Sequence, residues 1–274
     1  MGNVIDFLHA NAADGLVALT VQKEAAKRFN MSMPQVENQI LSLGLLPKRY
    51  ARNRKTITQE KQLSLFRSNV AVVGCGGLGG YLVEELARIG IGTIIVIDPD
   101  VFEEHNLNRQ LYATLTTLGG AKVAAAAQRV GEINPAVTVI PLQKAFSRDN
   151  GKCLLNQAHV VIDALDSIPI RLVLADICEL MNIPLIHGSI AGWYGQVTTQ
   201  FPGDRTLQKI YSGCTLEKGV EEELGNPSFS PALVASIEVA EAIKVLLNEG
   251  TTLRGKLLSI NLFDMEIVDI CIEG

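Results

Sequence analysis

The stretch Val70-Ala71-Val72-Val73-Gly74-Cys75-Gly76-Gly77-Leu78-Gly79 decides the fold of this chain. Four β-prone residues run into glycines, and an amphipathic pattern over residues 81–88 follows at once, which predicts a strand, a tight turn and a helix. Gly74 can take a positive φ in that turn, Gly76 lets the backbone approach a ligand, and Gly79 lets helix and strand pack closely. The exposed N–H groups at the start of such a helix favour a phosphate.

A carboxylate follows at the spacing of nucleotide-binding folds. The run Thr93-Ile94-Ile95-Val96-Ile97 predicts a second strand, and it ends at Asp98, nineteen residues past Gly79 (98 − 79). A carboxylate at this place is positioned to hold the hydroxyl groups of a ribose. Because strand, glycine turn, helix and acid occur together, the sequence predicts nucleotide binding.

The composition is that of an ordinary folded protein. The chain has 274 residues, of which 47% are hydrophobic and 19% charged, enough for one large α/β domain and a small appendage. No apolar run approaches the ~20 residues of a membrane span, and residues 1–11 lack the basic start of a signal peptide. The five cysteines form no CxxC pair, which indicates reduced thiols. We therefore expect a cytoplasmic protein with no membrane partner.

The net charge of −5 hides an asymmetry along the chain. Residues 1–68 hold ten Lys or Arg and five acids, giving +5, so the remainder carries −10 (−5 − 5). Five of these cations crowd into eight residues: Lys48, Arg49, Arg52, Arg54 and Lys55. Such a cluster can bind nucleic acid, reach into a phosphate site, or form a solvated connector.

Residues 1–47 are predicted to form a helical N-terminal module. Apolar residues keep helical spacing from Val17 to Phe29, and a second helix over Pro34–Leu43 is expected behind a Ser32 cap. The spacing is that of a helix-turn-helix, but the second helix contains no Lys or Arg to hold phosphates. We therefore expect a docking or dimer-forming module and no nucleic-acid partner.

Residues 48–274 are predicted to form the nucleotide-binding domain. Strand and helix patterns alternate from residue 69 onward, which favours a Rossmann-like, doubly wound, mainly parallel sheet. A long functional or disordered loop is expected over Pro202–Ser228, and antiparallel strands close the chain. The expected helices are Leu78–Ile89, Ala121–Ile133, Ile168–Met181 and Pro231–Leu247; the expected strands are Val70–Val73, Ile94–Ile97, Val137–Pro141, His159–Ile162, Pro184–His187, Gln196–Phe201, Lys256–Phe263 and Met265–Ile272.

Charged residues after Asp98 favour a triphosphate over a nicotinamide dinucleotide. Arg109 and Lys122 follow the ribose strand, where a nicotinamide enzyme has little use for them. A triphosphate that loses pyrophosphate needs cations along its chain and a carboxylate for Mg²⁺. Residues 160–166, Val-Val-Ile-Asp-Ala-Leu-Asp, would supply that carboxylate at the end of a strand.

These residues resemble the ThiF/MoeB/HesA family of adenylyltransferases, bacterial relatives of ubiquitin-activating enzymes. The resemblance covers residues 49–264 and rests on several spaced motifs: Arg49-Tyr50-Ala51-Arg52, the glycine turn, Asp98-Pro99-Asp100, Asn106-Leu107-Asn108-Arg109-Gln110, Lys122, Asp163-Ala164-Leu165-Asp166 with Arg171, Gly195-Gln196-Val197 and Glu241-Ala242-Ile243-Lys244. It implies a homodimer that binds Mg·ATP and adenylates the C-terminal glycine carboxylate of a small ubiquitin-like sulfur carrier protein ending in Gly-Gly.

The resemblance also implies roles for single residues. Asp98 would hold the ribose, and Asp166 would bind Mg²⁺. Arg52, reaching into the partner subunit's ATP site, would neutralise charge as pyrophosphate leaves, as would Asn106, Arg109 and Lys122. The implied nucleotide-binding set is Gly74, Gly76, Gly77, Leu78, Gly79, Asp98, Asp100, Asn106, Arg109 and Lys122, and the implied catalytic set is Arg52, Arg109, Lys122 and Asp166.

Other positions stay open or depart from the family pattern. Asp163 either joins the site or hydrogen-bonds the strand end, and Arg171 and the four histidines are expected to be structural. Many family members hold zinc with two CxxC pairs, whereas the late loop offers only Cys214 and the tail only Cys271, so we expect no structural zinc. Cys214 is either a catalytic thiol or an inert one.

Two other functions are compatible with the sequence. The same scaffold could adenylate a different carboxylate, such as that of a peptide or a modified tRNA base. Less favoured is a nicotinamide-binding regulator whose N-terminal module reads DNA.

Overall fold

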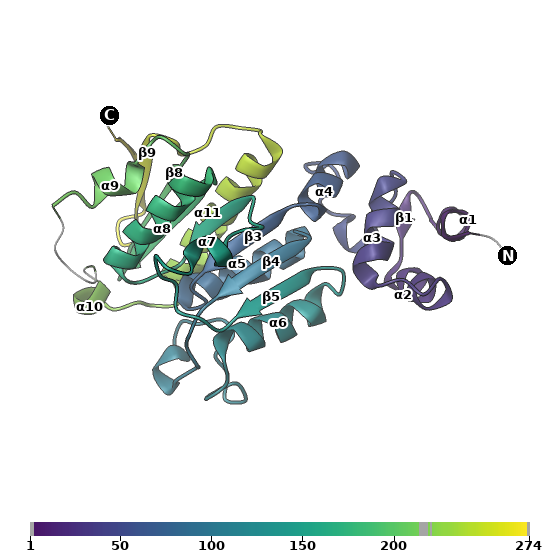
Figure 1. The fold of residues 1–274 in the computed structure, drawn as a ribbon, viewed down its shortest axis with the longest axis horizontal. Coiled ribbons are helices and arrows are strands. Elements are labelled where there is room, and N and C mark those ends of the chain that lie inside the picture. The colour runs from purple at the N-terminus through teal and green to yellow at the C-terminus, as the bar shows by residue number, and fades with distance from the viewer. Residues whose placement is uncertain (1–2, 214–218, 220, 273–274) are drawn as a thin grey trace.

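An eight-stranded mixed sheet forms the centre of the molecule in a computed structural model that describes residues 3–213, 219 and 221–272 (Figure 1). The strand order is β10-β9-β8-β7-β6-β3-β4-β5, with β3 to β7 parallel and β8, β9 and β10 antiparallel. The predicted fold class is therefore confirmed. The strands are β3 (Asn69–Val73), β4 (Thr93–Ile97), β5 (Thr138–Leu142), β6 (Val160–Asp163), β7 (Leu185–Ala191), β8 (Tyr194–Gln200), β9 (Lys256–Asn261) and β10 (Glu266–Cys271).

Helices cover both faces of this sheet because both faces are apolar. On β3, Val70 and Val72 pack into one core, whereas Ala71 and Val73 pack into the core on the opposite face. Burial on both sides is characteristic of parallel strands in α/β folds. The first face is covered by α5 (Gly77–Ile89), α6 (Lys122–Ile133) and α11 (Phe229–Leu247), and the second by α7 (Gly151–Leu154) and α8 (Ile168–Met181).

The glycine turn between β3 and α5 has the geometry predicted for it. Gly74 has φ +101°, a backbone conformation that L side chains rarely adopt. A Cβ on Gly79 would lie 2.0 Å from the carbonyl oxygen of Gly74, so any side chain there would force the helix off the strand. Both glycines are therefore required for the helix to begin directly above the strand end.

The N-terminal module lies at the end of the molecule opposite the antiparallel strands (Figure 1). It has its own apolar core, and Ser32 forms the predicted cap as a capping box with Gln35. Val17 lies in a two-residue strand rather than in the predicted helix. The module's elements are α1 (Val4–Ala10), β1 (Leu16–Val17), α2 (Leu19–Arg28), α3 (Met33–Ser42) and β2 (Leu46–Pro47). The 3-10 helix η1 (Lys48–Tyr50) and the helix α4 (Gln59–Phe66) follow it; α1 and α4 were not predicted.

Half-buried Arg49 and buried Tyr50 connect this module to the end of α6. The Arg49 guanidinium forms an ion pair with Glu37 of α3, and the Tyr50 hydroxyl donates to the same carboxylate at 2.7 Å. Asn134, at the end of α6, donates to the Tyr50 oxygen at 2.7 Å. The first half of the Arg-Tyr-x-Arg motif is therefore structural.

The predicted loop over Pro202–Ser228 is wrong in part, because it contains helices. α9 (Thr206–Ile210) and α10 (Glu221–Leu224) lie within it. Leu207 of α9 is fully buried, and its N–H donates to the Gln200 side chain at 2.9 Å, so packing orders a segment without clear helical periodicity. Cys214 lies outside the described residues. Within the described ranges, no helix is long and apolar enough to cross a bilayer.

Candidate active site

A cavity of about 450 Å³ opens at the carboxyl ends of β3, β4 and β6. Its wall brings together the glycine turn and four charged residues from separate segments, namely Asp98, Arg109, Lys122 and Asp166. Ligands of α/β sheets bind at this edge, because the strand ends and the first turns of the helices meet there.

The start of α5 forms the floor of this cavity. Gly76 is the N-cap of the helix, and Gly77 and Leu78 also line the wall. A Cβ on Gly76 would meet only the Gln110 side chain, at 3.5 Å, so the backbone is open to a ligand. Gly79 packs against Gly74 instead of lining the cavity. The free N–H groups of the first turn suit an anion.

An aspartate pair follows β4 on one side of the cavity. Asp98 is 5% exposed, and its carboxylate accepts from the N–H groups of Cys75 at 2.6 Å and Asp100 at 2.8 Å. Because Asp98 lines the cavity, its predicted contact with a ribose is sterically possible. The carboxylate of Asp100 is largely exposed and accepts from the Lys122 ammonium at 2.9 Å. This pair therefore places the ammonium beside the cavity.

Arg109 and Asp166 also line the cavity and interact electrostatically. The Arg109 guanidinium donates to the carbonyl of His105 at 3.0 Å and to the Asn108 side chain at 2.8 Å. Burial lowers the pKa of Arg109 from its usual value, and the negative charge of Asp166 counteracts this. Asp166 follows β6 by three residues and is exposed. Arg109 and Lys122 thus line the same cavity as the accessible carboxylate of Asp166.

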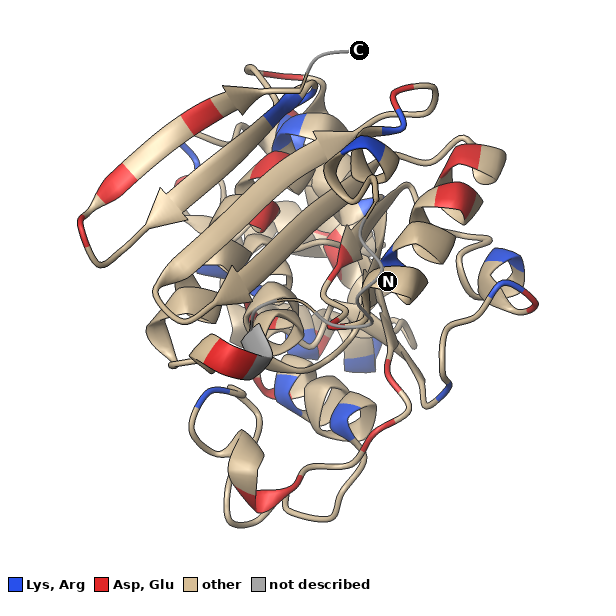
Figure 2. Ribbon diagram, turned by 90° about the vertical axis from the view of Figure 1, so that its left-hand side faces the viewer, with Lys and Arg blue, Asp and Glu red and all other residues tan. Residues whose placement is uncertain are grey.

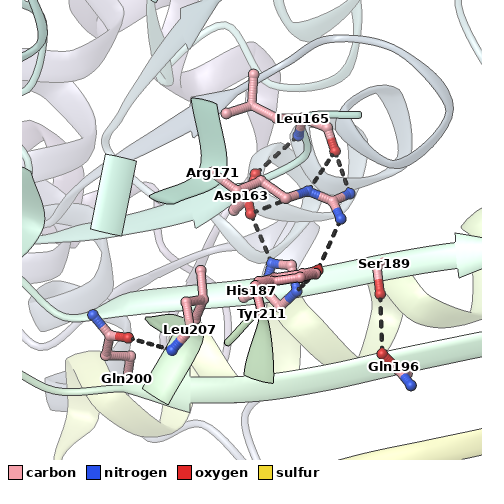
Figure 3. Close-up of polar contacts among 9 residues, drawn as sticks. All are labelled: Asp163, Leu165, Arg171, His187, Ser189, Gln196, Gln200, Leu207 and Tyr211. Atoms are coloured by element: carbon pink, nitrogen blue, oxygen red, sulfur yellow. Dashed lines mark hydrogen bonds and ion pairs between the residues drawn. The ribbon is translucent and has the colours of Figure 1, made fainter. Parts of the chain in front are cut away.

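Asp163 is fully buried at the end of β6, and its carboxylate contacts protein groups around the strand end, not the cavity. It accepts from the Leu165 N–H at 3.0 Å and bonds the Nδ1 atom of His187 at 2.7 Å. Arg171 lies 3.7 Å away and also donates to the carbonyl of Leu165 at 3.0 Å (Figure 3). The expected structural roles of Arg171 and His187 agree with these contacts.

Besides Gly79, two other predicted site residues, Asn106 and Arg52, do not line the cavity. Asn106 is 4% exposed, and its side chain accepts from the Glu103 N–H at 3.0 Å, closing a short 3-10 turn, η2 (Glu104–Asn106). Arg52 is exposed and follows Tyr50, which packs on Gly90 just before β4 begins. It therefore lies at the amino-terminal edge of the strands, whereas the cavity is at their carboxyl ends. Arg52 is therefore not among the residues that line its own chain's cavity.

The cavity also contains residues that the sequence analysis did not assign to it. Lys144 and Phe146 follow β5, Ile190 lies in β7, and Asn226 comes from the segment before α11. Only Gln110 carried a signal, since it ends the motif that contains Arg109. The other four lie far apart along the chain, and the order of the strands in the sheet brings them to one cavity.

A second, smaller cavity adjoins the first. This groove measures about 340 Å³ and shares only Arg171 and Ile190 with the first cavity among their described lining residues. Strands β7 and β8, which form much of it, carry no Lys, Arg, Asp or Glu, as the uncoloured sheet in Figure 2 shows. Its described polar side chains are Ser189, Tyr194, Gln196, Tyr211, Ser259 and Arg171.

The described residues suit magnesium better than a protein-enclosed metal. Among them, no three His, Cys, Asp or Glu side chains gather in a way that could hold an ion. Magnesium is commonly held by one or two carboxylates together with substrate phosphates. Asp166 fits that donor set, and the absence of structural zinc stays a prediction.

Comparison with known proteins gives consistent matches. A model of the ThiF family matches residues 50–273. The SAMP-activating enzyme E1 of Haloferax volcanii is 36% identical over 222 residues, covering 79% of this chain and 82% of that protein. The sulfur carrier protein adenylyltransferase of Thermus thermophilus is 33% identical over 207 residues, covering 73% and 76%.

Other relatives and structures differ in length or sequence. The chain spans only 57% of the adenylyltransferase and sulfurtransferase MOCS3 of Danio rerio. The crystal structure of E. coli MccB matches with a TM-score of 0.71 at 18% identity, covering 92% of this chain and 80% of that one. This last match shows the fold alone.

Proposed function

We infer that this chain, which belongs to the ThiF family, is an ATP-dependent adenylyltransferase that activates the C-terminal glycine carboxylate of a small ubiquitin-like sulfur carrier protein. The observation that carries the proposal is the convergence of Arg109, Lys122 and Asp166 on one cavity above the start of α5. Two of the relatives are named as enzymes that activate such carriers.

The reaction needs charge stabilisation rather than a base. The acceptor carboxylate is already ionised at neutral pH, and its oxygen attacks the α-phosphorus of ATP. A new P–O bond forms, the bond between the α-phosphorus and the bridging oxygen breaks, and pyrophosphate leaves with the electron pair. Arg109 and Lys122 stabilise the negative charge that develops, and the N–H groups of Gly77 and Leu78 hold phosphate oxygens. Asp98 orients the ribose.

Asp166 would hold magnesium together with the phosphates. When bound, the ion neutralises phosphate charge and so supports departure of pyrophosphate. We also propose that the enzyme acts in the cytoplasm, where thiols such as its scattered cysteines stay reduced.

We propose that the second, smaller groove is the route of the carrier's C-terminal tail. It leads to the nucleotide cavity past Arg171 and Ile190, and strands β7 and β8 give it a wall without charged side chains that suits an extended glycine-rich backbone. Polar groups such as Ser189, Gln196 and Ser259 can satisfy peptide N–H and C=O groups without discriminating charge. We call it the acceptor groove below.

A homodimer would complete the site, because Arg52 lies away from its own chain's cavity. We propose that it stabilises the leaving pyrophosphate in the partner subunit. Arg52→Ala and Asp166→Ala chains, each inactive alone, should regain activity when mixed, since one composite site per mixed dimer keeps both residues. Activity of Arg52→Ala alone at the wild-type level would refute this assignment.

The main test is ATP–pyrophosphate exchange with defined acceptors. Exchange should appear with a ubiquitin-like carrier ending in Gly-Gly and disappear when the final glycine is removed. Arg109→Ala should lower exchange about 10²- to 10³-fold, while circular dichroism shows an intact fold. Exchange supported only by peptides or by a modified tRNA base would replace the carrier with another acceptor.

A further inference from the structure

A chain of hydrogen bonds runs beneath the acceptor groove toward the turn that carries Asp166. The Tyr211 hydroxyl lies 3.0 Å from His187 Nε2, and His187 Nδ1 lies 2.7 Å from Asp163 (Figure 3). Arg171 donates to the Tyr211 oxygen at 3.0 Å and to the carbonyl of Leu165 at 3.0 Å. Leu165 in turn donates its N–H to Asp163 at 3.0 Å. These contacts form a closed ring.

The partners fix the direction of each bond in the ring. His187 is fully buried, and burial lowers the pKa of His187, so its imidazole is neutral near pH 7. The Asp163 carboxylate can only accept, so the proton sits on Nδ1 of His187 and leaves Nε2 as an acceptor. Tyr211 therefore donates to His187, and its oxygen accepts from Arg171. The donors and acceptors along the ring are therefore mutually consistent.

Two positions connect this ring to the two cavities. Tyr211 lines the acceptor groove directly after α9, and Arg171 lines both the groove and the nucleotide cavity. Arg171 fixes the backbone at Leu165, which immediately precedes the proposed magnesium ligand Asp166. Two side chains, Tyr211 and Arg171, thus connect the wall of the acceptor groove to the Leu165–Asp166 turn.

We propose that Tyr211 is a positioning residue, whose hydroxyl aligns Arg171 and the Leu165–Asp166 turn with the acceptor groove. This rests on the proposed function. The hydroxyl does not contact the reacting phosphate. It fixes the position of the Leu165–Asp166 turn relative to the acceptor groove. A misplacement of about 1 Å can cost about 10²-fold in rate, so a single correctly placed bond has a kinetic effect.

A proton-relay role fits these residues less well. Tyr211, His187 and Asp163 have the connectivity of a nucleophile, base and carboxylate. However, the acceptor carboxylate needs no base, and the Tyr211 proton already faces His187. Burial also raises the pKa of Tyr211, which disfavours a phenolate. The ring therefore orients groups and carries no proton to the substrate.

Tyr211→Phe is the direct test, and Tyr112→Phe is its matched control. Each removes one hydroxyl, from a half-buried ring at Tyr211 and a buried ring at Tyr112, but the Tyr112 hydroxyl has no hydrogen-bond partner in the described structure. Tyr211→Phe should lower kcat/KM for the carrier about 10- to 100-fold, the value of a hydrogen bond to charged groups. The Kd of ATP without carrier should stay within twofold, and Tyr112→Phe should match wild type.

Several results would overturn the inference. One is unchanged kcat/KM in Tyr211→Phe; another is an equal loss in Tyr112→Phe; a third is a loss of ATP affinity as large as the loss in kcat/KM. If the wild-type enzyme were inactive with every Gly-Gly carrier, the proposed function itself would be wrong. Failure of the Tyr211 inference and failure of the proposed function are therefore distinguishable.

His187→Asn supplies a second variant and a coupling measurement. Asn can still donate to Asp163 but offers no acceptor to Tyr211, so its kinetic defect should equal that of Tyr211→Phe. The double variant should be no worse than either single one, because both break the same contact. Multiplicative losses would show independent roles and contradict the ring. Nitrogen NMR should show His187 as the Nδ1–H tautomer in wild type; an Nε2–H tautomer would reject the assigned bond directions.

Discussion

Two aspartate pairs flank β3, and they have similar local sequences but different surroundings. Ile97-Asp98-Pro99-Asp100 ends β4, and Ile162-Asp163-Ala164-Leu165-Asp166 ends β6. In each pair the inner carboxylate is buried and accepts a backbone N–H two residues on, whereas the outer one is exposed. The pairs differ in what the inner carboxylate faces.

The inner aspartate after β4 borders open space, and the one after β6 does not. Asp98 accepts from two backbone N–H groups and lines the cavity, whereas Asp163 is enclosed by His187 and Arg171. β4 has β5 on its outer side, whereas β6 has β7, which places His187 beside Asp163. The comparison teaches that a strand-end carboxylate becomes a ligand site or an internal brace according to the neighbouring strand.

The largest expected effect distinguishes the two inner carboxylates. Asp163→Ala leaves buried Arg171 and His187 without their shared partner, so the free energy of unfolding should fall by about 3–5 kcal/mol. Asp98→Ala should cost less, because water in the cavity can replace the carboxylate at both N–H groups. Urea unfolding of both variants measures the difference, and equal losses would remove the proposed distinction.

The next effect concerns the outer carboxylate after β6. Asp166→Asn should lower carrier-dependent ATP–pyrophosphate exchange about 10²- to 10³-fold, because it removes the proposed magnesium ligand. The urea midpoint should stay near that of wild type, since the side chain is exposed. Asp149→Asn, an exposed carboxylate outside the cavity, is the matched control. Exchange at the wild-type rate in Asp166→Asn would assign the ion to other groups.

A smaller effect comes from a buried carboxyl on the far side of β7. Glu238 of α11 packs against Gly188, and neither carboxyl oxygen has a partner in the described structure. Burial raises the pKa of Glu238 well above its ordinary value, with Asp163 adding to the rise. The folded state therefore keeps a proton that the unfolded chain releases above pH 4.5.

Stability should then fall as pH rises above that value, until the folded carboxyl also ionises. The slope from one proton is at most about 1.4 kcal/mol per pH unit. Glu238→Gln should remove this contribution and unfold at higher urea than wild type at pH 8. Parallel urea midpoints for the two proteins between pH 5 and 8 would contradict the assignment.

The smallest effect is expected at the outer carboxylate after β4. Asp100 is largely exposed where it pairs with Lys122, so Asp100→Asn should change the free energy of unfolding by no more than about 1 kcal/mol. Added salt should shrink the difference further, because exposed charges are screened. If Asp100→Asn lowered the free energy of unfolding as much as Asp163→Ala, the distinction between exposed outer and buried inner carboxylates would be wrong.

Local signals in the sequence sufficed for much of the fold. Gly74 and Gly79 were assigned their roles from spacing alone, and their φ and contact distances agree. The Ser32 cap was also recognised, because a capping box involves residues three apart. These features depend on steric limits and hydrogen bonds within a few residues, which any chain with this local order must satisfy.

Long-range partners could not be predicted in the same way. α9 was missed because it depends on burial of Leu207, and the link between Arg49 and Glu37 spans two predicted units. Tyr211 reaches residues 24 and 40 positions away. The surroundings of Asp163 likewise depend on β7, the strand that places His187 beside it.

The sequence by itself determined the nucleotide-binding turn, the alternation of strands and helices, and the cations and carboxylates available for triphosphate chemistry. Only the tertiary structure decided which carboxylate faces the cavity, that Arg52 lies at the opposite edge from it, and that Tyr211 connects the groove to the Leu165–Asp166 turn. The reason is that backbone conformation follows from neighbouring residues, whereas the surroundings of a side chain follow from strand order, which places distant segments side by side.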